Sequence, residues 1–190
     1  MTRRYELKER ARRQAETRQR IVEAAVDLHT SVGPARTTIS AIAARAGVER
    51  HTVYAHFPDD SALFAACSAH WAAQHPTPDL AAVAAIEDPT RRLRRALTEL
   101  YGWYESVEAD LAVIIRDAPL VPANAAALAE TTRELAALAD ALARGRPRRK
   151  AVRAAIGHAL EFETWRSLMR RQGLSRTQAV EAMLRLVASV

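Results

Sequence analysis

The spacing of apolar residues constrains the fold of this chain more than any other feature. Apolar side chains recur every three or four residues along most of the sequence, which is the repeat of an amphipathic helix. One such stripe consists of Ile21, Ala24, Ala25 and Leu28. Alternating runs rich in Val, Ile and Thr, typical of strands, do not occur. The pattern predicts an all-α fold of about nine helices, and 49% hydrophobic residues in a chain of 190 suffice for a sizeable core.

Glycine and proline divide this pattern into separate helices. Gly33-Pro34 predicts the end of the first helix, because glycine favours a helix C-terminus and proline cannot continue it. A short second helix follows, capped by Thr37 or Thr38, and the chain turns at Gly47. A third helix is predicted at about 49–56. Two short helices joined by a glycine turn are the layout of a helix-turn-helix unit, which binds DNA.

Other capping residues divide the remainder of the sequence. Asp59 is predicted to cap a fourth helix, and Asp88-Pro89 to open a fifth. An eighth helix is predicted to carry Val152 and to reach Gly173 without a break. Ser175, with Gln178 three residues later, matches a capping box for the last helix.

The net charge of +6 is concentrated near the N-terminus. Residues 1–57 hold 11 of the 28 Lys and Arg residues but only 6 of the 22 Asp and Glu residues. This asymmetry favours a polyanion such as DNA as the partner of the first third of the chain, although a solvated basic tail has the same composition. The first residues are predicted to form a basic arm, with DNA contacts from Arg3, Arg4, Arg10 and Arg12.

Two interpretations of the arm remain open. Flexible arginines can enter a narrow minor groove or neutralise phosphates beside the binding site. The same residues can instead extend the first helix, with ion pairs such as Glu6 with Arg10 and Glu16 with Arg20.

A longer pattern runs through the predicted helix-turn-helix unit. It consists of TTISAIAARAGV at 37–48, TVYAHF at 52–57 and LF at 63–64. These residues resemble the signature of TetR-family transcriptional regulators, and the resemblance covers about residues 17–64. It implies an N-terminal three-helix DNA-binding domain and a C-terminal helical domain for ligand binding and dimerisation. We therefore divide the chain into a basic arm at 1–16, a helix-turn-helix domain at 17–60 and an effector-binding and dimerisation domain at 61–190.

The predicted DNA contacts lie on and around the third helix. Docking in the major groove brings the start of this helix nearest to the bases, which selects Glu49, Arg50, His51 and Thr52. Arg50 is the leading base reader, because a guanidinium can donate twice to guanine; a phosphate clamp or a merely exposed arginine is the alternative. The resemblance implies phosphate contacts by Tyr54, His56 and Thr38.

Three residues depart from the family pattern. Asp60 stands where family members usually carry lysine, Glu49 where they carry a small hydroxylated residue, and His51 where they often carry glycine or proline. A carboxylate repels phosphate, so a contact is expected to be lost at Asp60 or supplied by the basic arm.

Catalysis has little support in the C-terminal part of the sequence. It carries no glycine-rich phosphate loop, no Cys/His cluster with metal-ligand spacing and no nucleophile elbow. His158 and Glu161 could begin a metal or acid–base site, but solvated polar side chains are the favoured interpretation. We expect no cofactor and no metal.

Large aromatic residues stand out in a region that is otherwise rich in Ala and Leu. They either fill the core or line a cavity. The resemblance implies a ligand pocket, and the residues nominated for it are Trp103, Tyr104, His158, Phe162 and, as an outlying charge partner, Arg116. An apolar or aromatic small molecule fits this set better than a polyanion does.

The last two predicted helices carry apolar side chains on more than one face. A homodimer would cover what one chain leaves exposed, as the resemblance also implies. The residues predicted for this interface are Trp165, Leu168, Met169, Met183, Leu184 and Val187. Such a dimer presents two reading helices ~34 to 36 Å apart, which predicts a palindromic operator.

Cellular location is predicted from two further features. The single cysteine, Cys67, excludes an intramolecular disulfide and favours the cytoplasm; buried packing is favoured over a redox sensor. No run approaches the roughly 20 apolar residues of a membrane span. The leading hypothesis is a repressor released from DNA by a small ligand. The alternatives are an architectural DNA-binding protein without an effector and, more distantly, a helical enzyme that uses His158 and Glu161.

Overall fold

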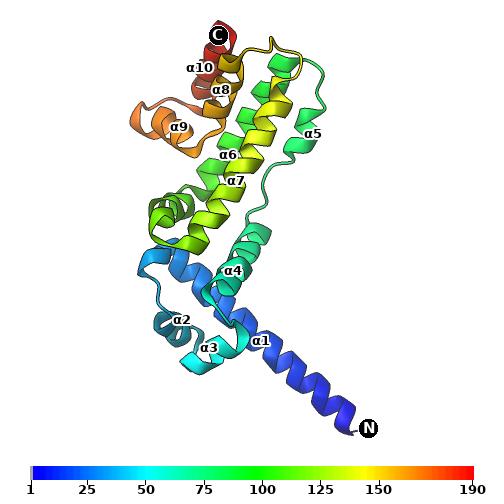
Figure 1. The fold of residues 1–190 in the computed structure, drawn as a ribbon, viewed down its shortest axis with the longest axis vertical. Helices are drawn as coiled ribbons and strands as arrows, with labels where there is room; N and C mark the ends of the chain where they lie inside the picture. The colour runs from blue at the N-terminus through cyan, green and yellow to red at the C-terminus, as the bar shows by residue number, and fades with distance from the viewer. Residues whose placement is uncertain (1) are drawn as a thin grey trace. The chain divides into compact units, whose positions relative to one another are not determined.

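The computed structural model describes residues 2–190, and for residues 2–4, 81 and 84 it describes the backbone alone. The described residues form helices and turns without a strand, so the predicted all-α class is confirmed (Figure 1). The helices are α1 (Thr2–Ser31), α2 (Ile39–Ala46), α3 (Arg50–His56), α4 (Asp60–Gln74), α5 (Leu80–Ala84), α6 (Pro89–Asp117), α7 (Pro122–Ala143), α8 (Lys150–Leu160), α9 (Phe162–Arg166) and α10 (Arg176–Ser189).

The chain forms two compact units, and each is built from two segments. The first consists of Met1–Pro76 and Ala109–Leu128, and the second of Thr77–Glu108 and Ala129–Val190. The long helices α6 and α7 therefore contribute to both units. The boundary predicted at residue 60 falls inside the first unit, because α4 packs against α1.

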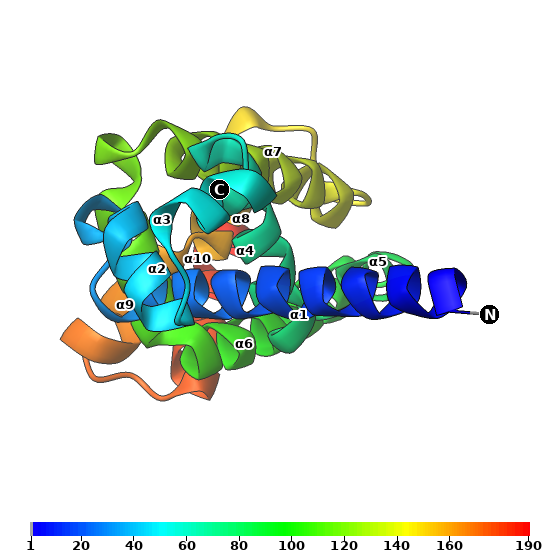
Figure 2. The same ribbon diagram turned by 90° about the horizontal axis from the view of Figure 1, so that it is seen from below.

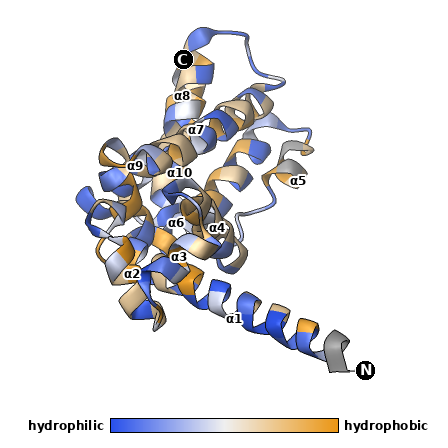
Figure 3. Cartoon of the chain, turned by 60° about the horizontal axis from the view of Figure 1, so that its bottom comes forward, coloured by the Kyte–Doolittle hydropathy of each residue, from blue (hydrophilic) through white to orange (hydrophobic). Residues whose placement is uncertain are grey.

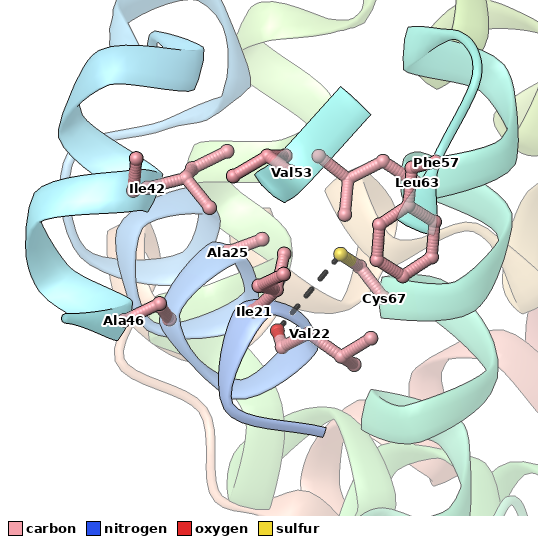
Figure 4. Close-up of a cluster of buried hydrophobic side chains, with 11 residues drawn as sticks. Ile21, Val22, Ala25, Ile42, Ala46, Val53, Phe57, Leu63 and Cys67 are labelled. Carbon is pink, nitrogen blue, oxygen red and sulfur yellow. Dashed lines mark hydrogen bonds between the residues drawn. The ribbon is translucent and has the colours of Figure 1, made fainter. Parts of the chain in front are cut away.

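The first unit is held together by a cluster of buried apolar side chains from α1 to α4 (Figure 4). Val53 and Phe57 fasten α3 to this cluster, and the Cys67 thiol of α4 donates to the Val22 carbonyl at 3.9 Å. Burial raises the pKa of Cys67 to about 12, so the thiol stays protonated and unreactive. These observations favour the packing interpretation of Cys67 over a redox sensor.

Local capping chemistry fixes the helix-turn-helix unit. The Thr38 hydroxyl accepts from the Ala41 amide at 3.1 Å, so Thr38 rather than Thr37 caps α2. Gly47 ends α2 with φ +66°, a left-handed conformation that glycine adopts without strain. Asp59 caps α4 by accepting from Ala62, as predicted.

The second unit packs α8 and α10 near α6. Its buried residues include Leu93 and Leu97 of α6, Ile156 of α8 and Val180 of α10. Ion pairs join α6 to the C-terminal segment at Arg94–Glu181, Glu105–Arg176 and Glu108–Arg170. The predicted capping box of Ser175 and Gln178 is present at the start of α10.

The prediction of an unbroken helix to Gly173 is wrong. The backbone leaves the helical conformation at Glu161, with φ −71° and ψ +138°, and α9 starts at Phe162. The carbonyls of Ala159 and Leu160, next to this break, accept from the hydroxyls of Tyr101 and Tyr104 at 2.9 and 2.7 Å. In an unbroken helix, backbone amides would donate to these two carbonyls. Here the tyrosine hydroxyls of α6 donate to them instead.

Among the described residues, no single helix is long and apolar enough to cross a membrane. The segments Pro89–Leu120 and Pro122–Ala143 pass that test only as a pair, and they meet at a bend of 116°.

Candidate nucleic-acid interface

Helix α3 has one packed face and one exposed face. Val53 is buried in the core, whereas Arg50, His51 and Tyr54 are exposed, Tyr54 with 48% of its surface accessible. None of these three side chains forms a hydrogen bond or ion pair with another residue that the structure describes. Glu49 precedes α3 as its N-cap, and its carboxylate makes no capping bond. The structure therefore leaves Arg50, His51 and Tyr54 without partners of their own among the described residues.

The predicted phosphate contacts have different surroundings. Thr38 is exposed and uses its oxygen to cap α2, so its hydroxyl hydrogen remains available to a phosphate. Thr52 and His56 are half-buried on the side of α3 that faces α1, where they line a groove of about 560 Å³. Asp60 is exposed in the first turn of α4.

The N-terminal residues form a helix and not a loose arm. Helix α1 runs without a break from Thr2, in agreement with the helix-extension interpretation. The ion pairs differ from those predicted: Arg12 pairs with Glu9 and, at 2.7 Å, with Glu16. Arg10 has no ion pair with another described residue. The predicted contacts at Arg3 and Arg4 lie outside the described side chains.

The end of α6 docks against the turn between α1 and α2, inside the first unit. The buried Asp117 carboxylate accepts from the Ala35 amide at 3.0 Å and from Arg116 Nε at 2.7 Å. Arg116 Nη2 also donates to the Val32 carbonyl at 3.1 Å. The bond from Arg116 lowers the pKa of Asp117, which keeps the carboxylate charged.

Gly33 makes this close approach possible. Its φ of +103° lies in a region that favours glycine, and a side chain there would collide with Asp117 and Arg116. The sequence predicted Gly33 only as a helix stop. The sequence did not predict the role of Asp117. Its neighbours in the sequence give no sign that its carboxylate binds a turn more than 80 residues away.

The helix-turn-helix segment matches a known family. Residues 21–67, from α1 to α4, match the profile of bacterial regulatory proteins of the tetR family. Residues 21–67 are therefore similar to the N-terminal domain of that family. The predicted resemblance is thereby confirmed.

Solved structures share the fold of this chain across most of its length. A TetR-like transcriptional regulator from Rhodococcus sp. RHA1 is 21% identical, covers 90% of this chain and 93% of its own, and has a TM-score of 0.61. A putative TetR-family regulator from Mesorhizobium loti MAFF303099 is 20% identical, with coverages of 93% and 96% and a TM-score of 0.61. The multidrug binding protein EbrR, complexed with imidazole, is 25% identical, with coverages of 89% and 88% and a TM-score of 0.55. No curated protein matches the chain.

The aromatic residues nominated for a ligand pocket are mostly packed. Tyr104 and Phe162 are buried edge-to-face with ring centroids 5.3 Å apart. Burial raises the pKa of Tyr104, whose hydroxyl is bonded to Leu160. For these two residues the structure shows the core-packing alternative. Trp103 is half-exposed, with its ring centroid 5.6 Å from that of Tyr104.

The polar nominees belong to different units. Arg116 belongs to the first unit, where its guanidinium donates to the Asp117 carboxylate and to the Val32 carbonyl. His158 is exposed, within 3.1 Å of the Thr164 hydroxyl and 3.6 Å of Glu161. In the described part of the chain, no three His, Cys, Asp or Glu side chains are grouped to hold a metal ion.

Four residues predicted for the dimer interface lie in the chain's own core. Trp165 is fully buried against Tyr104 and Phe162, which corrects its assignment. On α10, the same correction applies to Met183, Leu184 and Val187. Leu168 and Met169 are half-exposed and remain available. Most of this apolar surface is therefore buried within the chain itself.

Proposed function

We propose that this chain is a TetR-family repressor that binds a palindromic operator as a homodimer and is released by a small apolar or aromatic ligand. The observation that supports DNA reading most strongly is the exposed face of α3. Arg50, His51 and Tyr54 have no partner there among the described residues, within a segment that matches the family profile. Access to chromosomal DNA implies a cytoplasmic location.

Base reading is assigned to the start of α3, which enters the major groove. Arg50 donates to a guanine edge, and Glu49, His51 and Thr52 contact neighbouring bases. Tyr54, His56 and Thr38 bind phosphates and fix the position of the helix on the duplex. Apart from Thr38, which caps α2, these residues lie on or directly before α3, and Val53 and Phe57 anchor α3 in the core.

Dimer formation is assigned to the C-terminal segment. Leu168 and Met169 are half-exposed, and Leu186 of α10 leaves 37% of its surface accessible. Covering these side chains with a second copy would remove apolar surface from water. The two reading helices of such a dimer meet successive turns of the major groove.

Ligand control is assigned to α6 together with α4. Helix α6 carries Trp103 in the second unit and Asp117 in the first, where Asp117 holds the turn at Gly33. A ligand beside Trp103 that shifts α6 would disturb this turn. The disturbance would reach helices α1 to α4, which carry the predicted DNA contacts and are called the reading head below. EbrR, with its bound imidazole, is a relative of similar fold that takes a small aromatic ring. The ligand must bind the DNA-incompetent state more tightly, since equal affinity for both states shifts nothing.

The test compares binding to enriched and to random duplexes at the same salt concentration. The proposal predicts a clear preference for the enriched duplex and a reduction of that preference in Arg50→Ala, which loses one of several base contacts. Arg45→Ala is a matched control, because Arg45 lies on α2 and is ion-paired with Asp27. Equal affinity for all duplexes would favour an architectural DNA-binding protein instead.

A further inference from the structure

A groove runs between the N-terminal half of α1 and helix α3, within the first unit. In two views at right angles, this half of α1 projects beyond α2 and α3 (Figures 1 and 2). The groove has a volume of about 560 Å³. Its walls include Glu6, Arg10, Arg13 and Thr17 of α1 and Thr52 and His56 of α3.

The walls of this groove are polar. The projecting turns of α1 are largely hydrophilic (Figure 3), and the lining residues supply guanidinium, hydroxyl and imidazole groups. Arg10 is exposed and has no ion pair with another described residue. The carboxylate of Glu9 is held by Arg12, with Arg13 Nε at 3.6 Å. Of the two carboxylates in the lining, Glu9 is compensated and Glu6 is not, so the free donors of Arg10 and of α3 attract an anionic occupant against the charge of Glu6 alone.

Helical periodicity explains why these residues share the groove. Positions 6, 10, 13 and 17 recur every three or four residues, so they form one face of α1. Thr52 and His56 are four residues apart on the facing side of α3. Arg12 does not line the groove and is occupied by Glu9 and Glu16. The structure therefore selects Arg10 and Arg13 over Arg12.

We propose that this groove seats one sugar–phosphate strand of the duplex, so that α1 and α3 hold the same strand from opposite sides. The inference rests on the proposed function, in which α3 occupies the major groove. A phosphate strand borders that groove on each side, and polar side chains of this kind are the usual phosphate ligands. A groove with exposed walls also suits a linear polymer better than it suits an enclosed small molecule.

The length of the projecting helix sets how much DNA it follows. Residues 6–17 span about 18 Å at 1.5 Å per residue, which equals the rise of roughly five nucleotides of one strand along the duplex axis, at 3.4 Å each. Contacts with phosphates are independent of sequence. The extension of α1 therefore adds affinity from DNA around the bases that α3 reads, without adding base preference.

The test measures the salt dependence of binding to a fluorescein-labelled, mixed-sequence duplex of 40 base pairs. The variant Arg10→Ala/Arg13→Ala removes two phosphate contacts per protomer, so the slope of log K against log salt becomes shallower by about 1.8 per protomer. Arg91→Ala/Arg148→Ala removes the same charge from exposed positions in the second unit. This control is expected to retain the parent slope.

A single substitution tests the sign of the effect. Glu6→Gln removes a negative charge from the wall of the groove, so tighter binding to the same duplex is expected. If Arg10→Ala/Arg13→Ala and its control have equal slopes while the parent chain binds the duplex, the groove does not hold DNA and the proposed function survives. If the parent chain binds no duplex at all, the proposed function fails and this inference fails with it. Thermal unfolding of each variant checks that these exposed changes leave the fold intact.

Discussion

The exposed face of α3 and the aromatic cluster of the second unit differ in where their side chains find partners. Tyr54 of α3 is exposed and bonded to no other described residue. Tyr104 of α6 is buried, packs against Phe162 and donates to the Leu160 carbonyl. One tyrosine is left for an external partner, whereas the other completes the fold. The comparison shows that residue type alone does not identify a candidate site. A better sign is an exposed polar side chain that has no hydrogen-bond partner within the chain.

The largest expected effect is the loss of Trp165. This side chain is fully buried between Tyr104 and Phe162. Trp165→Ala is expected to lower the free energy of unfolding by about 3 to 5 kcal/mol because it leaves a cavity. Urea unfolding followed by circular dichroism measures it. A loss below about 1 kcal/mol would mean that the cluster is loosely packed and can admit a ligand.

The buried side of the reading head gives a pH-dependent effect. His29 of α1 lies against Phe64, with ring centroids 5.5 Å apart, and burial lowers the pKa of His29 from 6.5 to about 4. The unfolded chain then binds more protons than the folded chain between these values. Stability is therefore complete near pH 7 and falls by about 3 kcal/mol as the pH falls from 6.5 to 4.

Urea unfolding at several pH values checks this prediction. His29→Phe is the comparison variant, because its ring cannot take up a proton. Its stability is expected to depend less on pH in this range than that of the parent. Parallel curves for the two proteins would show that His29 is not responsible.

On the exposed side of the same head, Arg50→Ala is expected to relax one base position in each half-site. The loss amounts to about 1 to 3 kcal/mol of discrimination, since a bidentate contact with guanine disappears. Unfolding should be unchanged, because Arg50 has no partner among the described residues. Competition between operator variants in an anisotropy assay measures the loss. An unchanged base preference at every position would show that Arg50 does not read a base.

The smallest effects come from removing the two tyrosine hydroxyls in turn. Tyr104→Phe loses a buried hydrogen bond and is expected to cost about 1 kcal/mol or more of stability, with DNA binding unaffected. Tyr54→Phe should leave stability unchanged and weaken binding to all duplexes equally, by about 1 kcal/mol, because a phosphate contact disappears. The comparison fails if Tyr104→Phe weakens DNA binding without lowering stability, or if Tyr54→Phe lowers stability without weakening DNA binding.

Local chemistry made the reading head predictable. Thr38, Gly47 and Asp59 act on backbone groups within a few residues, so their types and spacing predicted the helix ends that the structure shows. The signature residues then predicted the resemblance to the TetR family, and the family profile matches the same segment, residues 21–67. The DNA contacts of Arg50 and its neighbours stay predictions.

Distant contacts account for what the sequence did not predict. The break at Glu161 follows from tyrosines of α6 that reach the Ala159 and Leu160 carbonyls, more than 50 residues away in the sequence. The hydrogen bond between Asp117 and the turn at Gly33 likewise joins residues that are far apart in the sequence. No periodic pattern carries such information.

The burial of four residues predicted for the dimer interface was missed for a related reason. Hydrophobicity shows that Met183, Leu184 and Val187 must be covered, but it does not show by which chain. The second unit covers them itself. Leu168 and Met169 have the same apolar character and remain half-exposed, a difference that depends on packing alone.

Selection of bound duplexes from a random pool tests the central claim most directly, because the claim is that α3 reads a specific operator. The account predicts one enriched sequence with two inverted half-sites whose centres lie about 10 base pairs apart. The same selection with Arg50→Ala should lose one conserved position in each half-site. A pool that shows no enrichment, although the protein binds its duplexes, would contradict the account.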